Sequence, residues 1–199
     1  MASTPTRFER ALLRDGDLLL REPVEADVPA IVAGCRDRLT QEWLPLPDPY
    51  DESHARGFVA DFAPRQLDSG AGIVCALEHQ GDYAGMIDCK KTDWRGRTTE
   101  IGYWVMPGHR GHGLAGRAAR LLADWALCDQ GIERVEIRAA TGNFGSQKAA
   151  LAAGFQREGV LRSAGFVHAG RVDLVVFGKL RSEVGSVGGA GSATGQRTS

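Results

Sequence analysis

The stretch that decides the fold is Glu100-Ile-Gly-Tyr-Trp-Val-Met-Pro-Gly-His-Arg-Gly-His-Gly-Leu-Ala-Gly116. Its first part predicts a strand over residues 98–105, and its last part predicts a long helix that opens near His112. Glycines at 108, 111, 113 and 116 leave the backbone N–H groups between these elements unobstructed, because no Cβ blocks a close approach. N–H groups at the positive end of a helix bind phosphate. We therefore expect a phosphate-binding turn.

The composition is that of an ordinary soluble domain, with 199 residues, 43% hydrophobic and 25% charged. A net charge of −1 argues against a broad nucleic-acid surface. No apolar run approaches the ~20 residues that span a bilayer. The four cysteines and five histidines are scattered, so we expect no metal site and reduced thiols in a cytoplasmic protein.

The periodicity predicts an α+β (mixed α/β) single domain over residues 1–181 and a flexible Gly/Ser-rich tail over 182–199. Residues 1–16 show little pattern, and residues 43–50 are a proline-broken loop. Strands are expected at 17–21, 71–79, 83–90, 98–105, 134–140, 155–161 and 171–180. Helices are expected at 25–36, from 51 or 53 to about 62 before Pro64, at 112–129 and at 143–153.

The glycines also match a dinucleotide fingerprint, since Gly111-His-Gly113-Leu-Ala-Gly116 reads G-x-G-x-x-G. Three antiparallel strands precede this turn, however, whereas a dinucleotide-binding unit begins with parallel strands. The acidic residue that such a unit needs ~20 positions later is also missing. No Gly-Lys-[Ser/Thr] supports a Walker-type site.

Two motifs carry a resemblance to a known family. Val105-x-Pro107-x-x-Arg110-Gly-x-Gly113-x-Ala115 resembles the acyl-CoA pyrophosphate loop of the GNAT N-acetyltransferases. Asn143-x-x-Ser146, with Gly154-Phe155 and Glu158-Gly-x-Leu-Arg162, resembles the second half of that family's cofactor region. Together with Glu100-x-Gly-Tyr-Trp, they are similar to the ribosomal-protein N-terminal acetyltransferase branch. The resemblance implies a mostly antiparallel sheet splayed at a cofactor cleft and flanked by helices.

The resemblance also implies acetyl-CoA as cosubstrate and assigns residues to it. The cofactor-binding residues would be Val105, Arg110, Gly111, His112, Gly113, Leu114, Ala115, Gly116 and Asn143. The N–H of Val105 would also stabilise the oxyanion. Gly102 inside a strand is compatible with a bulge that opens the cleft. Arg117, Arg120 and Lys148 are either phosphate contacts or solvated surface residues.

Acyl transfer to an amine needs a base near neutral pH, because an α-amino group has a pKa of ~7.7–8.0. Glu100 is the candidate base, or else a solvated strand residue, and it shares a face with Gly102 and Trp104. Ser146 would protonate the departing thiolate. Both Ser146 and Asn143 are alternatively helix-start residues. Direct attack in a ternary complex is favoured over a cysteine acyl-enzyme, since no cysteine has a visible activating partner.

The acceptor would be a primary amine, either a protein N-terminus or a small molecule, and a homodimer is compatible with the resemblance. The loop from Trp43 to Tyr50 would help to choose this acceptor, or else covers the edge of the core. One departure from that branch weakens the expectation that the acceptor is a ribosomal protein. Residues 163–168 lack the acidic residue that the branch carries there, although Asp173 matches another acidic position. A non-catalytic acyl-CoA sensor on the same fold is the alternative function.

Overall fold

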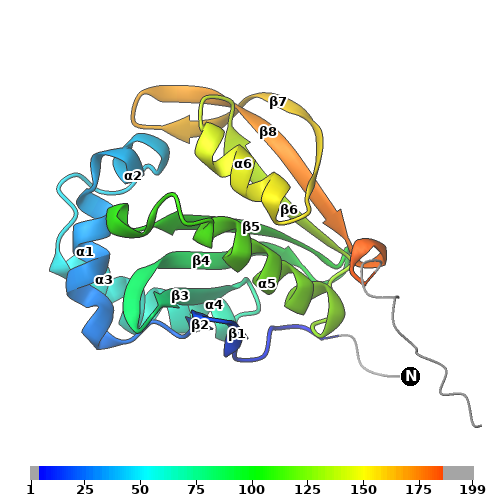
Figure 1. Cartoon of the computed structure of the whole chain (residues 1–199), viewed down its shortest axis with the longest axis horizontal. Coiled ribbons are helices and arrows are strands. Elements are labelled where there is room, and N and C mark those ends of the chain that lie inside the picture. Colours follow the sequence, from blue (N-terminus) through cyan, green and yellow to red (C-terminus); the bar gives the residue numbers. More distant parts are fainter. Residues whose placement is uncertain (1–4, 186–199) are drawn as a thin grey trace, which may run out of the picture.

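The computed structural model describes residues 5–185, which form one eight-stranded sheet in the order β1-β2-β3-β4-β5-β6-β8-β7 (Figure 1). The strands are β1 (Leu13–Asp15), β2 (Leu18–Arg21), β3 (Ile73–His79), β4 (Asp82–Asp93), β5 (Thr98–Val105), β6 (Arg134–Ala140), β7 (Gln156–Val167) and β8 (Gly170–Leu180). Neighbouring strands are antiparallel except β5 and β6, which are parallel. The predicted mostly antiparallel α+β fold is therefore confirmed.

Helices cover both faces of this sheet (Figure 1). They are α1 (Val28–Arg36), α2 (Arg38–Trp43), α3 (Glu52–Gly57), α4 (Ala63–Asp68), α5 (Leu114–Cys128) and α6 (Phe144–Ala152). The main core lies under α5, where Ile101 and Leu122 are fully buried. A second cluster lies under α1 on the opposite face and includes Trp104 of β5. Gly34 lets α1 approach that indole, because a Cβ there would lie 2.3 Å from the Trp104 ring.

The only parallel pair of the described sheet, β5 and β6, stays together for four residues. Pairing runs from Thr98 opposite Arg134 to Ile101 opposite Ile137 and then stops. Beyond Ile101 the two strands diverge toward the end of the sheet that carries α2 (Figure 1). The remainder of β5 therefore has free backbone groups on its β6 side.

The bulge with which the sequence at Gly102 is compatible does not form there, because Gly102 pairs regularly with Asp88 of β4. The irregularity between these strands lies instead between Lys90 and Asp93. A Cβ at Gly102 would lie 2.4 Å from Lys90 Nζ and 2.8 Å from Asp88 Oδ1. Glycine thus leaves room here for two β4 side chains that reach across β5.

Three further expectations need correction. Residues 13–15, expected to lack structure, form β1 through a turn at Gly16, whose φ of 59° favours glycine. A helix, α2, precedes the proline-broken loop because Asp37 caps it by accepting a hydrogen bond from Thr40 N–H. Helical structure also continues through Pro64: a π-turn over Phe58–Phe62 places this proline in the first turn of α4, where no N–H is needed.

The two C-terminal strands are longer than expected, and the described chain continues past residue 181. Arg181–Glu183 form a short 3-10 turn in which Glu183 Oε2 accepts a hydrogen bond from Leu180 N–H. Val184 packs against the main core. Residues 186–199, most of the predicted tail, lie outside the described residues.

Candidate active site

The glycine turn has the backbone that its sequence predicts. Gly111 and Gly113 have φ values of 81° and 72°, in the left-handed region that favours glycine. A Cβ at either position would meet no atom within 4 Å. The space above both glycines is therefore open, and the fold itself needs glycine here only for backbone conformation.

A row of N–H groups lines this open space. The first intrahelical bond of α5 runs from Arg117 N–H to Gly113 O, and the N-cap, Gly113, provides no side-chain acceptor. Within residues 5–185, no protein acceptor meets the N–H groups of residues 111–116. They point out of a positive helix end, which favours anions by ~0.3–1 kcal/mol or more when partly buried. This is the geometry of a pyrophosphate cradle.

Two residues predicted to bind the cofactor also have structural roles. Leu114 is buried in the main core. Gly116 faces α6, since a Cβ there would lie 3.2 Å from both Ala149 O and Ala152 Cβ. Their N–H groups still belong to the row, whereas the side chain of His112 is exposed beside it.

The side chain of Arg110 connects the glycine turn to α2. Its Nε donates to Val105 O at 2.9 Å, and its Nη2 contacts Asp37 Oδ2 at 2.5 Å and Thr40 Oγ1 at 3.1 Å. Burial alone would raise the pKa of Asp37, but the Arg110 guanidinium and the Thr40 N–H lower it. The guanidinium thus holds the loop against α2, so the predicted contact of Arg110 with the cofactor would come from its backbone.

The edge of β5 beyond Ile101 faces the gap between the diverging strands. Met106 N–H bonds Ala84 O on β4, and backbone groups alternate in direction along a strand. The N–H and C=O groups of Val105 and Tyr103 therefore point toward the gap. Val105 O already accepts a hydrogen bond from Arg110 Nε, which leaves Val105 N–H and the backbone groups of Tyr103 for a ligand. An extended chain could bind this edge as an added strand, and Val105 N–H could serve as the predicted oxyanion donor.

Glu100 lies at the closed end of the gap, in the paired part of β5 opposite Glu136. It is on the same face as Gly102 and Trp104, and its side chain is 12% exposed. Lys91 Nζ donates to Glu100 Oε2 at 2.9 Å, while Lys90 Nζ and Arg138 Nε lie 3.7 and 3.8 Å from its carboxylate. Glu100 is therefore an enclosed and charge-paired residue.

Asn143 and Ser146 begin α6 on the other side of the gap. Asn143 caps the helix, since its Oδ1 accepts a hydrogen bond from Ser146 N–H at 3.0 Å. Tyr103 OH donates to Ser146 O at 2.9 Å and lies 3.2 Å from Ser146 Oγ. Burial raises the pKa of Tyr103 to about 12. The phenol therefore stays protonated at neutral pH and connects β5 to Ser146.

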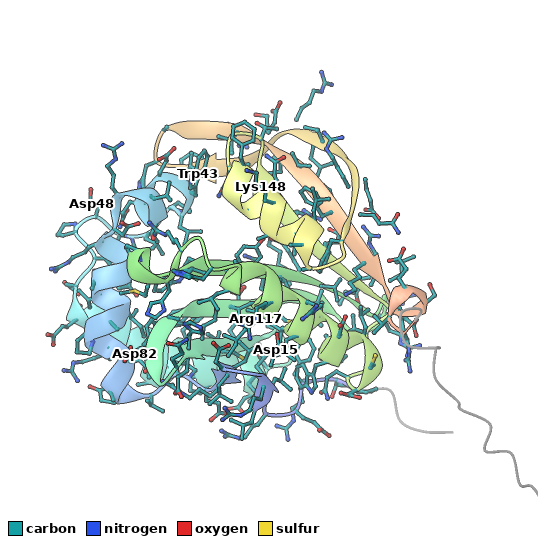
Figure 2. The ribbon with its side chains drawn as sticks, in the orientation of Figure 1. Asp15, Trp43, Asp48, Asp82, Arg117 and Lys148 are labelled. Atoms are coloured by element: carbon teal, nitrogen blue, oxygen red, sulfur yellow. The ribbon has the colours of Figure 1, made fainter. Side chains whose placement is uncertain are left out.

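The α2 helix spans the open end of the gap. A Cβ at Gly142, before α6, would lie 3.1 Å from the Trp43 ring, and Trp43 lies beside the start of α6 (Figure 2). On the other side, Gln41 Oε1 lies 3.0 Å from Nε2 of His168 in the turn between β7 and β8. Trp43 and Gln41 therefore connect α2 to the start of α6 and to the turn between β7 and β8.

The basic residues after the glycine turn differ in their contacts. Arg117 donates to Asp15 Oδ2 at 3.0 Å and to Asp17 Oδ1 at 2.9 Å, with Asp15 beside it in Figure 2. The Arg117 and Gln80 hydrogen bonds hold the pKa of Asp17 near 2. Arg120 also approaches Asp15. Arg117 is thus occupied in joining α5 to β1, whereas Lys148 is exposed on α6.

Sequence reasoning missed Asp88 and Asp37 because no motif marks them, and it gave no role to Tyr103, although this residue lies in the Glu100-x-Gly-Tyr-Trp motif. Asp173, matched to an acidic family position, accepts a hydrogen bond from Ser163 N–H and so braces the hairpin of β7 and β8. Cys35, Cys75 and Cys89 are buried, Cys128 is exposed, and all four are free. In residues 5–185, no three potential ligands gather as a metal site would require. No helix in the same range is long and apolar enough to cross a membrane.

Comparison with known proteins agrees with this geometry. Residues 17–156 match the family model "Acetyltransferase (GNAT) domain". The chain is 34% identical over 119 residues to "Putative ribosomal N-acetyltransferase YdaF" of Bacillus subtilis, a match that covers 60% of this chain and 65% of YdaF. It therefore spans about two thirds of that relative.

Solved structures have the same fold. One described as "Probable acetyltransferase" has a TM-score of 0.77 at 27% identity, covering 85% of this chain and 96% of its own. RimL, a ribosomal L7/L12 alpha-N-protein acetyltransferase in complex with coenzyme A, has a TM-score of 0.78 at 20% identity, covering 85% and 98%. The chain belongs to the GNAT family of acetyltransferases. This family takes its acetyl group from acetyl-CoA.

Proposed function

We propose that this protein is an N-acetyltransferase that moves the acetyl group of acetyl-CoA to a primary amine, by direct attack in a ternary complex. The observation that carries the proposal is the unpaired N–H row over residues 111–116 beside the gap between β5 and β6. The row would bind the pyrophosphate, and the backbone groups of Tyr103 on the edge of β5 would bind the pantetheine arm.

In the proposed reaction, the amine nitrogen attacks the thioester carbonyl carbon. Val105 N–H stabilises the oxyanion, and the C–S bond then breaks. Glu100 takes the proton of the amine, directly or through water, and releases its contact with Lys91 as it does so. The thiolate takes up the second proton that the nitrogen loses once the C–N bond has formed. Ser146 Oγ–H relays this proton, giving its own to the sulfur and regaining the one from the nitrogen, and Tyr103 OH, 3.2 Å from Oγ, holds Ser146 in place. The cytoplasm is the expected location.

The base assignment is tested by Glu100→Gln. We expect turnover to fall by ~10²–10⁴-fold, the usual contribution of a general base, with little change in acetyl-CoA affinity. Glu78→Gln is the matched control, because Glu78 on β3 also pairs with a basic residue, Arg21 at 2.8 Å, outside the site. Turnover equal to wild type at every pH would refute the role of Glu100.

The enzymatic function is tested by thiol release from acetyl-CoA. The acceptors would be a peptide with a free α-amino group, spermidine and an aminoglycoside. A non-catalytic sensor predicts coenzyme A binding without thiol release for any of them. Peptides should be tried first because YdaF and RimL are named for ribosomal N-acetylation.

A further inference from the structure

Asp88 is a carboxylate at the point where the gap opens. It lies on β4 directly opposite Gly102, the first β5 residue beyond the last pair with β6. Paired residues of neighbouring strands share a face, so Asp88 faces the same side as Glu100 and Trp104. Gly102 provides no side chain, so nothing on β5 separates the Asp88 carboxylate from the gap.

The Asp88 carboxylate is fixed on one oxygen and open on the other. Gly102 N–H donates to Oδ1 at 3.0 Å. Within residues 5–185, Oδ2 has no hydrogen-bond partner and is not fully buried, because the side chain is 28% exposed. Burial raises the pKa of Asp88, which the nearby ammonium of Lys90 opposes. A cation at Oδ2 would therefore stabilise the ionised carboxylate.

Lys90 shows that an ammonium group fits between two carboxylates here. Its Nζ lies 3.9 Å from Asp88 Oδ1 and 3.7 Å from Glu100 Oε1. Neither distance is that of a direct hydrogen bond, and the Lys90 side chain is 37% exposed. Glu100 keeps closer contact with Lys91. Lys90 is thus held loosely and can leave without stripping Glu100 of its partner.

We propose that the ammonium group of the acceptor binds between Asp88 and Glu100, in the position that Lys90 Nζ fills in the free protein. Asp88 then determines specificity for a cationic amine, and Lys90 competes with it. Asp88 holds the ammonium beside the thioester while Glu100 receives its proton. The inference rests on the proposed function and adds the group that recognises the substrate.

Two substitutions should change the KM of the acceptor in opposite directions. Asp88→Asn should raise the KM of the acceptor tenfold or more, as expected when a hydrogen bond to a charged group is lost. Lys90→Met should lower that KM severalfold, because the competing cation is gone. Neither should change the KM of acetyl-CoA. Asp82→Asn, an exposed carboxylate on the same strand (Figure 2), is the matched control and should behave as wild type.

The experiment uses the full chain and whichever of the three amines the wild type acetylates fastest. A twofold or smaller effect of Asp88→Asn on acceptor KM, or an equal rise in acetyl-CoA KM, would overturn the inference and leave the proposed function standing. If the wild type acetylates none of the amines, both proposals fall. Should Asp88→Asn not fold, Gly102→Ala replaces it. Its Cβ would displace Lys90 Nζ and Asp88 Oδ1, so an unchanged acceptor KM would overturn the inference.

Discussion

Substitution of Gly113 by valine should separate ligand binding from folding. The structure predicts two independent costs. Gly113 has a φ of 72°, which costs an L-residue ~1–2 kcal/mol. Its Cβ would meet no protein atom within 4 Å, so no clash adds to this cost. For a domain of this size, that strain corresponds to a decrease in Tm of about 2–8 °C.

The second cost is a loss of coenzyme A affinity. The valine side chain would project into the space over the N–H row and keep a pyrophosphate from its donors. Loss of one or two hydrogen bonds to a charged group, at ~1.5–3 kcal/mol each, should weaken coenzyme A binding by about 10-fold or more. Isothermal titration calorimetry measures the affinity, and thermal unfolding measures the strain.

Gly81→Val provides the matched control. Gly81 lies in the turn between β3 and β4 and has a φ of 89°, and a Cβ there would also meet no atom within 4 Å. It should lose similar stability and keep full coenzyme A affinity. The reasoning is refuted if folded Gly113→Val binds coenzyme A like wild type, or if Gly81→Val loses affinity to the same extent.

Two further substitutions examine the structural contacts around the site. Asp37→Asn keeps the cap of α2 but loses the Arg110 ion pair, at a cost of ~1–2 kcal/mol near neutral pH. The pKa of Asp37 is lower in the folded protein than in the unfolded chain, so this stabilisation is present above the unfolded pKa of ~3.9 and is lost as the pH falls through the folded value. Urea unfolding should therefore give the same free energy of unfolding for both proteins in acid. Asn143→Ala should cost ~0.5–2 kcal/mol as a lost cap, whereas Asn143→Asp should retain it. If only stability changes, and coenzyme A affinity in calorimetry is unaffected by both Asn143 variants, its predicted cofactor contact is wrong.

Local periodicity carried most of the fold. The strand Thr98–Val105 and the helix α5 follow from the spacing of their apolar residues, whereas α6 follows from Asn143 at its start and Gly154 after its end. The elements that the sequence did not predict depend on pairing with other strands or have no local sequence signal. The three residues of β1 form a strand only because a glycine turn brings them next to β2, with which they pair. The π-turn before Pro64 has no recognisable sequence signal.

The site divides in the same way. The glycine turn could be predicted because its glycines act through their own backbone conformation. Asp88 could not, since its significance depends on pairing with Gly102 and on where β6 departs from β5. The sequence likewise predicts no partner for Arg110, because Asp37 is distant along the chain. Contacts of that range are set by topology.

Arg110 joins the two halves of the site through a single side chain. One end of its guanidinium bonds the Val105 carbonyl at the gap, and the other bonds the residue that caps α2. The α2 helix in turn carries Trp43 and Gln41, which contact the start of α6 and the turn between β7 and β8. In the proposed ternary complex, a ligand on the glycine turn that changes the contacts of Arg110 would therefore also act on α2. Because coupling of this kind is reciprocal, the acceptor would tighten cofactor binding by the same factor.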